Sequence, residues 1–196
     1  MAIRPIEDLI NVERPALPWL TSALSAAGER ATVLPVDAAA GEDVLFRLQV
    51  TVASALGSLA RYTGGVLVEH SWLRLLGGGS GNLPSLAAVN GLGTPGQDSQ
   101  PPPLLEVGRD VLGGRFVVNG GAFEGQQGHV FYFAPDTLAW ESLGVGHGDF
   151  IAWALSDAVS DFYADLRWEG WETVVAAVPM DHALSVYPPL FTAQSK

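Results

Sequence analysis

Histidine and carboxylate side chains are the groups in this sequence that could carry acid–base or metal chemistry. No two of the four histidines are spaced i, i+2 or i, i+4, so no short metal-binding motif is present. A pocket could still form in space from His129, Asp136 and His147, which fall in adjoining predicted elements beside the turn-rich segment 119–128. We keep these three residues as a ligand-pocket alternative. Because isolated structural histidines are far commoner, we predict no metal site and no cofactor.

Three further patterns resemble catalytic or nucleotide-binding motifs but lack the context that the chemistry requires. Gly91–Gly96 matches G-x-G-x-x-G, yet the following QDSQPPP cannot open the helix of a dinucleotide site. Gly77–Gly81 lacks the lysine and the hydroxyl residue of a phosphate loop. Asp181, His182 and Ser185 are triad residue types, but they lie close together in the chain with no glycine-rich oxyanion loop. The sequence therefore predicts no catalytic residue.

Three aspartates recur in the C-terminal half. Asp157, Asp161 and Asp165 follow one another every four residues and would share one face of a continuous helix. Acid–base catalysis needs carboxylates with different pKa values, which a regular acidic face does not provide. We interpret this face as solvated, with an interaction surface for a basic protein as the functional alternative. Trp168 and Trp171 follow, and either could pack in the core or anchor a partner.

Composition excludes several classes of function. Ten basic and 21 acidic residues give a net charge of −11, opposite in sign to that of a nonspecific nucleic-acid binder. No run of about 18 apolar residues occurs, so no membrane-spanning helix is expected. The N-terminus, MAIRPIEDLINVERP, does not resemble a signal peptide. The absence of cysteine fits a reducing compartment. We expect a cytoplasmic protein that binds neither nucleic acid nor membrane.

The hydrophobic pattern predicts a single α+β domain over residues 1–196. Helices are expected at about 5–28, and a helical period of apolar residues runs from Val44 to about Gly64. Short apolar segments separated by glycine turns predict a mostly antiparallel, twisted sheet of about five or six strands, with helices on one face. The Gly- and Pro-rich segment 91–103 is predicted to be a flexible loop.

The C-terminal half holds the clearest elements. Val130–Phe133 is apolar on both faces, as expected of a central strand. Gly113-Gly114 is expected to turn the chain between two earlier strands. From about Asp149, an apolar stripe that continues to Leu166 predicts one helix carrying the three aspartates.

Two motifs stand out, YFAPDTLAWE at Tyr132–Glu141 and LRWEGWE at Leu166–Glu172. Together they resemble a bacterial family of about this length that is recorded as a domain of unknown function, and the likeness extends from Trp72–Gly77 to Tyr187–Leu190. The family implies no reaction. More loosely, the order of elements is similar to the SUKH superfamily, many of whose members resemble cytosolic immunity proteins that neutralise toxins. That resemblance implies a SUKH-like fold and a basic partner for an acidic face.

Three hypotheses follow. The first is a non-catalytic binding module of the immunity type, which holds a basic protein through the three aspartates with Trp168 or Trp171 as anchor. Its basis is segment 141–172, where seven acids stand against one base. The second is an enzyme or small-ligand protein with a pocket near segment 119–128, using His129, Asp136 or His147. The third is a structural homodimer built on a sheet edge or a tryptophan patch.

Overall fold

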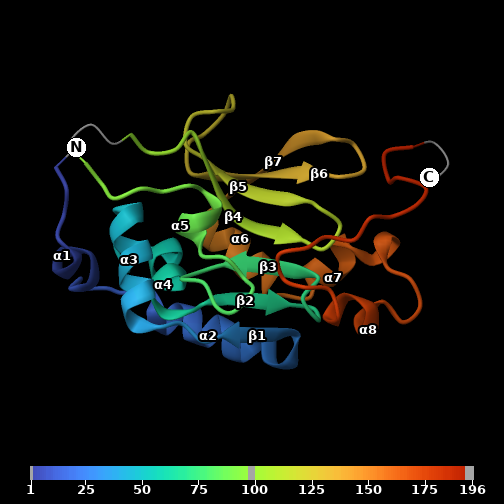
Figure 1. Cartoon of the computed structure of the whole chain (residues 1–196), viewed down its shortest axis with the longest axis horizontal. Coiled ribbons are helices and arrows are strands. Elements are labelled where there is room, and N and C mark those ends of the chain that lie inside the picture. Colours follow the sequence, from blue (N-terminus) through green and yellow to red (C-terminus); the bar gives the residue numbers. More distant parts are fainter. Residues whose placement is uncertain (1, 97–99, 193–196) are drawn as a thin grey trace.

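The computed structural model describes residues 2–96 and 100–192. Its centre is an open, entirely antiparallel sheet of seven strands that follow one another in sequence order (Figure 1). The strands are β1 (Ala31–Leu34), β2 (Gly65–Val68), β3 (Leu73–Leu76), β4 (Leu104–Asp110), β5 (Arg115–Asn119), β6 (His129–Ala134) and β7 (Ala139–Gly146). The α+β prediction is confirmed, with one strand more than the upper number expected.

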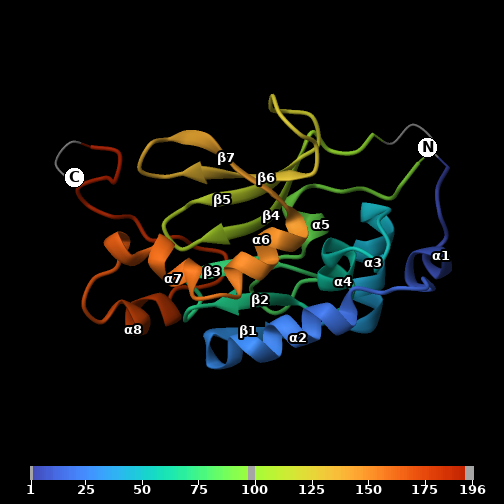
Figure 2. The same cartoon turned by 180° about the vertical axis from the view of Figure 1, so that it is seen from behind.

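Eight α-helices lie in the described part of the chain. They are α1 (Ile6–Ile10), α2 (Leu17–Ala27), α3 (Ala38–Leu48), α4 (Ala55–Tyr62), α5 (Leu86–Val89), α6 (His147–Ala154), α7 (Ala158–Phe162) and α8 (Trp171–Ala176), with 3-10 turns η1 (Gly28–Arg30) and η2 (Ala164–Leu166). Helices α6 and α7 lie on the sheet face nearer the viewer in Figure 2, whereas the C-terminal segment crosses the opposite face in Figure 1. None of these helices combines the length and the hydropathy needed to cross a bilayer.

The helical pattern between Val44 and Gly64 forms two helices and not one. Helix α3 ends at Leu48; the next residue, Gln49, has a left-handed φ of 54°, and its side chain donates to the Phe46 carbonyl at 2.8 Å. Helix α4 begins after Ser54, whose hydroxyl accepts a hydrogen bond from the Gly57 amide at 3.0 Å. Side-chain caps at both ends satisfy backbone groups that a continuous helix would have paired internally.

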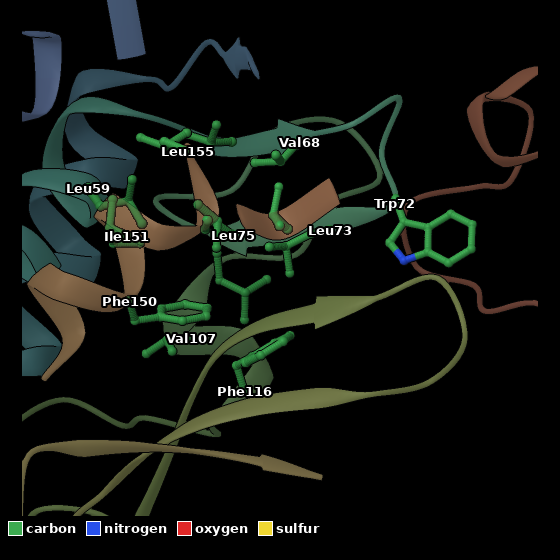
Figure 3. Packing of buried hydrophobic residues seen from close by; sticks show 14 of the residues in the cluster. Leu59, Val68, Trp72, Leu73, Leu75, Val107, Phe116, Phe150, Ile151 and Leu155 are labelled. Atoms are coloured by element: carbon green, nitrogen blue, oxygen red, sulfur yellow. The ribbon is translucent and has the colours of Figure 1, made fainter. Parts of the chain in front are cut away.

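The core lies between the sheet and helices α4 and α6. Figure 3 shows Phe116 of β5, Phe150 of α6 and Val107 of β4 close together; the two ring centroids are 4.9 Å apart and all three side chains are fully buried. Leu75 of β3 and Ile151 of α6 belong to the same cluster. This contact fixes the helix that follows β7, and with it the chain that continues to α7 and α8.

The segment predicted to be a loop, 91–103, contains no helix or strand in its described residues. Residues 97–99 of that prediction lie outside the described part of the chain. Its flexibility stays a prediction.

Replacing Phe116 by Ala should lower the free energy of unfolding by about 3–5 kcal/mol, because a buried ring is lost from a packed interface. Phe191→Ala is the matched control, since that ring is 52% exposed, and it should change stability by less than about 0.5 kcal/mol. Urea unfolding followed by tryptophan fluorescence measures both. Equal losses in the two variants would contradict this assignment of the core.

Candidate functional site

An aromatic cluster closes the end of the sheet where β3 begins. Trp72 is fully buried, and its ring centroid lies 5.2 Å from that of Trp171 and 5.9 Å from that of Trp168. Trp171, at the start of α8, is only 9% exposed, whereas Trp168 is 38% exposed. Of the two roles considered for these tryptophans, core packing therefore applies to Trp171, whereas Trp168 presents part of its ring to solvent.

The Arg167 guanidinium lies over this cluster, 4.2 Å from the ring centroid of Trp171 and 5.2 Å from that of Trp72. Its Nη1 is 3.6 Å from Glu69 Oε2, and Ser160 Oγ donates to Glu69 Oε1 at 2.7 Å. Burial lowers the pKa of Arg167 and Glu69 opposes that shift, but an arginine still stays charged at neutral pH. Cation–π and ionic contacts thus tie segment 160–171 to the turn between β2 and β3.

That turn has an unusual backbone. Glu69, His70 and Ser71 are three consecutive non-glycine residues with positive φ, at 50°, 54° and 75°. Each such residue costs of the order of 1–3 kcal/mol and persists only where its surroundings hold it. Backbone hydrogen bonds from the Glu69 amide to the Arg30 carbonyl and from the Trp72 amide to the Glu69 carbonyl hold it here. A strained turn at the molecular surface is a common feature of functional sites.

The three aspartates do not lie on one helix. The helix expected from Asp149 stops at Ala154, and α7 and η2 follow as separate short elements. Ser156 breaks it, because its hydroxyl donates to the Trp153 carbonyl at 2.8 Å and accepts from the Ala158 amide at 3.3 Å. Asp157 precedes α7 and pairs with Arg30 at 2.7 Å. The prediction that the three aspartates share one face of a continuous helix is therefore wrong.

Asp161 and Asp165 nevertheless remain exposed beside exposed apolar side chains. Phe162 is 43% exposed and Val174 is 45% exposed, comparable with Trp168. Among the described residues, Asp161, Asp165, Glu169 and Glu172 form no ion pair at salt-bridge distance. We call the following exposed residues the α7–α8 surface: Asp161, Phe162, Asp165, Trp168, Glu169, Glu172 and Val174.

The structure does not assemble His129, Asp136 and His147 into one pocket. His129 pairs with Gly146 at one end of β6, next to His147, whereas Asp136 is exposed in the turn beyond the other end. A six-residue strand separates the two ends by about 20 Å. Within the described residues no group of three or more histidine, aspartate or glutamate side chains could hold a metal. Both ring nitrogens of His147 are buried and have no hydrogen-bond partner among the described residues.

Two buried carboxylates that sequence reasoning missed organise the centre of the sheet. Asp110 accepts from the Tyr132 hydroxyl at 2.7 Å and from the Tyr163 hydroxyl at 3.1 Å. Burial raises the pKa of Asp110, while these hydrogen bonds oppose the rise. Glu106 binds two arginines, Arg109 and Arg115.

One sequence signal pointed to this arginine pair, because a turn at Gly113-Gly114 places Arg109 opposite Arg115. Strand alternation, however, predicts that Glu106 points to the other face from Arg109. A β-bulge between Glu106 and Gly108 reverses that alternation. The bulge has no signature in the sequence, so the carboxylate was not assigned to the pair.

His147 makes stability depend on pH. Burial lowers its pKa to about 4, below the value near 6.5 of an unfolded chain. Below pH 6.5 the unfolded chain gains a proton that the folded protein takes up only near pH 4, so acid lowers the free energy of unfolding. From pH 7.5 to pH 5 the loss should be about 2 kcal/mol in the wild type, and His147→Phe should remove that part. Urea unfolding at both pH values measures it; an unchanged pH dependence in the variant would contradict the assignment.

Comparison with known proteins identifies sequence relatives and a family for this chain. A protein of Escherichia coli K12 named "Putative uncharacterized protein YbfG" is 36% identical over 191 residues, covering 95% of this chain and 85% of that protein. An "Uncharacterized protein" of Haemophilus influenzae is 32% identical over 171 residues, covering 87% of this chain and 75% of the relative. No solved structure matches the chain. Residues 6–196 match the family model described as "Protein of unknown function DUF2625", and the chain belongs to that family.

Proposed function

We propose that this protein is a non-catalytic binding module that holds a basic protein against the α7–α8 surface. The observation that carries the proposal is that, in the described part of the chain, the exposed acids Asp161, Asp165 and Glu169 form no ion pair and lie in the same segment as the partly exposed Trp168. Carboxylates that are not neutralised within the chain attract a positively charged partner and raise the association rate. A partly exposed indole supplies the apolar contact that most often dominates a protein interface.

Buried aromatic and ionic contacts support this surface. Trp168 rests on the buried ring of Trp72, and Arg167 joins the same segment to Glu69. A surface held by buried aromatic rings loses little conformational entropy when a partner binds. The strained β2–β3 turn lies beneath the same segment, in keeping with a structure that holds this region in one conformation.

The resemblance to SUKH immunity proteins adds an analogy. In that analogy the protein is cytoplasmic and its partner is a basic toxin or another basic protein. The acidic composition and the absence of cysteine agree with this assignment. The strength of the proposal rests on the α7–α8 surface and not on the analogy, since one fold hosts many functions.

The test exchanges charge on this surface alone. Asp161→Lys combined with Asp165→Lys reverses two exposed acids and leaves Asp157 and its pair with Arg30 intact. Wild-type and variant proteins, immobilised separately, are exposed to the native cytosol, and retained proteins are identified by mass spectrometry. We expect a basic protein on the wild type that binds the variant at least about tenfold more weakly, with a slower association rate.

A matched control makes the same charge change elsewhere. Glu7→Lys with Asp8→Lys alters two exposed acids of α1, at the opposite end of the molecule (Figure 1). This control should bind the partner as the wild type does. Equal weakening in both variants would indicate a nonspecific charge effect, and unchanged binding in the α7–α8 variant would overturn the proposal. Self-association of the wild type in light scattering would instead favour the homodimer.

A further inference from the structure

Three arginines stand side by side across the middle of the sheet, on the face opposite α6. Arg74 of β3 is directly opposite Arg109 of β4, and Arg109 is directly opposite Arg115 of β5. Like charges at opposed positions of antiparallel strands repel one another. In a chain of net charge −11, such a row needs either compensating carboxylates or a bound anion.

Glu106 compensates for part of this charge. Its Oε1 accepts from Arg109 Nε at 3.0 Å and Nη2 at 2.7 Å, and its Oε2 accepts from Arg115 Nε at 2.6 Å and Nη2 at 2.5 Å. The Glu106 side chain is 4% exposed, so both contacts are shielded from water. One carboxylate cancels one of the two positive charges. It also fixes the orientation of both guanidinium groups.

The outer edges of these two guanidinium groups remain available. A guanidinium has five N–H donors, and Glu106 occupies the side formed by Nε and Nη2. In the part of the chain that the structure describes, the edge formed by Nη1 and Nη2 makes no other hydrogen bond or ion pair in Arg109 or Arg115. The Arg115 side chain is 52% exposed and that of Arg109 is 26% exposed. Two parallel N–H groups on each edge match the geometry of a carboxylate or a phosphate.

Arg74 adds a third positive charge behind the pair. It is fully buried, and its nearest acceptors are uncharged backbone carbonyls, including that of His182 at 2.6 Å. Its Nη2 is buried without a hydrogen-bond partner among the described residues. Burial lowers the pKa of Arg74 and the charge of Arg109 lowers it further, while the charges of Asp110 and Asp181 oppose both shifts. Among the described residues, no carboxylate contacts the Arg74 guanidinium directly.

A cavity of ≈330 Å³ opens on this row, within the size range of small-ligand sites. The titratable groups that line it are Glu106, Arg109, Asp110, Arg115, Asp181 and His182. The Asp110 carboxylate does not compete for the arginines, because its oxygens accept from Tyr132, Tyr163 and the amides of Leu112 and Gly114. Asp181 is half exposed, and its Oδ1 lies 2.7 Å from His182 Nδ1.

We propose that this cavity binds a small oxyanion, a carboxylate or phosphate group, through the outer edges of Arg109 and Arg115. Glu106 holds both guanidinium groups in place before the ligand arrives, which reduces the entropy lost on binding. His182 also lines this cavity. This ligand site is distinct from the α7–α8 surface, and its function does not depend on a protein partner.

Isothermal titration with inorganic phosphate and, separately, with malonate tests the proposal at constant ionic strength. The wild type should show saturable binding of one or both anions, and the preferred probe tells a phosphate ligand from a carboxylate ligand. Arg115→Gln removes one charged edge and should weaken binding at least about tenfold. Arg115→Lys keeps the charge without the paired N–H groups, so its affinity for the anion should lie between that of the wild type and that of Arg115→Gln.

Arg14→Gln is the matched control, because Arg14 is exposed and carries the same charge; it should bind as the wild type does. Circular dichroism checks that the variants fold, and Arg115→Lys serves if Arg115→Gln does not. Absence of saturable binding of both anions to the wild type at tens of millimolar would overturn the proposal. Equal weakening by Arg14→Gln and Arg115→Gln would also overturn it, since it would reveal a general charge effect.

Discussion

The contacts of the buried Arg74 guanidinium support both the proposed interaction surface and the proposed ligand cavity. A charge without contact with water is costly unless its donors are occupied. The carbonyls of Pro179, Met180 and His182 accept from its Nη1 at 3.2, 2.9 and 2.6 Å. The chain after α8 is therefore held across the sheet. This contact keeps α8 beside the aromatic cluster and places one wall of the proposed oxyanion cavity.

Other buried polar groups join distant elements in the same way. Asp110 connects the β4–β5 turn to Tyr132 of β6 and to Tyr163 at the end of α7. Glu69 connects the β2–β3 turn to Ser160 and Arg167. Hydrophobic burial is non-directional and gathers these elements, whereas directional polar contacts select one relative placement. The proposed interaction surface and the proposed ligand cavity both lie where such contacts reach the exterior.

The errors in the helix boundaries have one cause. Apolar periodicity predicted the antiparallel sheet and the presence of helices near 44–64 and after Asp149, because it reports which face of an element is buried. It does not report where a helix is interrupted inside such a pattern. Ser54 and Ser156 end or begin helices through their own side-chain hydrogen bonds, which compete with the helical backbone. Breaking the second helix separated the three aspartates.

The sequence by itself determined the α+β class, the acidic character, and the turn that brings Arg109 opposite Arg115, since these follow from composition and from contacts between near neighbours. Only the tertiary structure decided which charges meet. Arg74 Nη1 and its acceptors are separated by more than one hundred residues, and a bulge in β4 turned Glu106 towards the arginines. Partners of this kind depend on how whole elements pack, and packing is a property of the entire chain that no local pattern encodes.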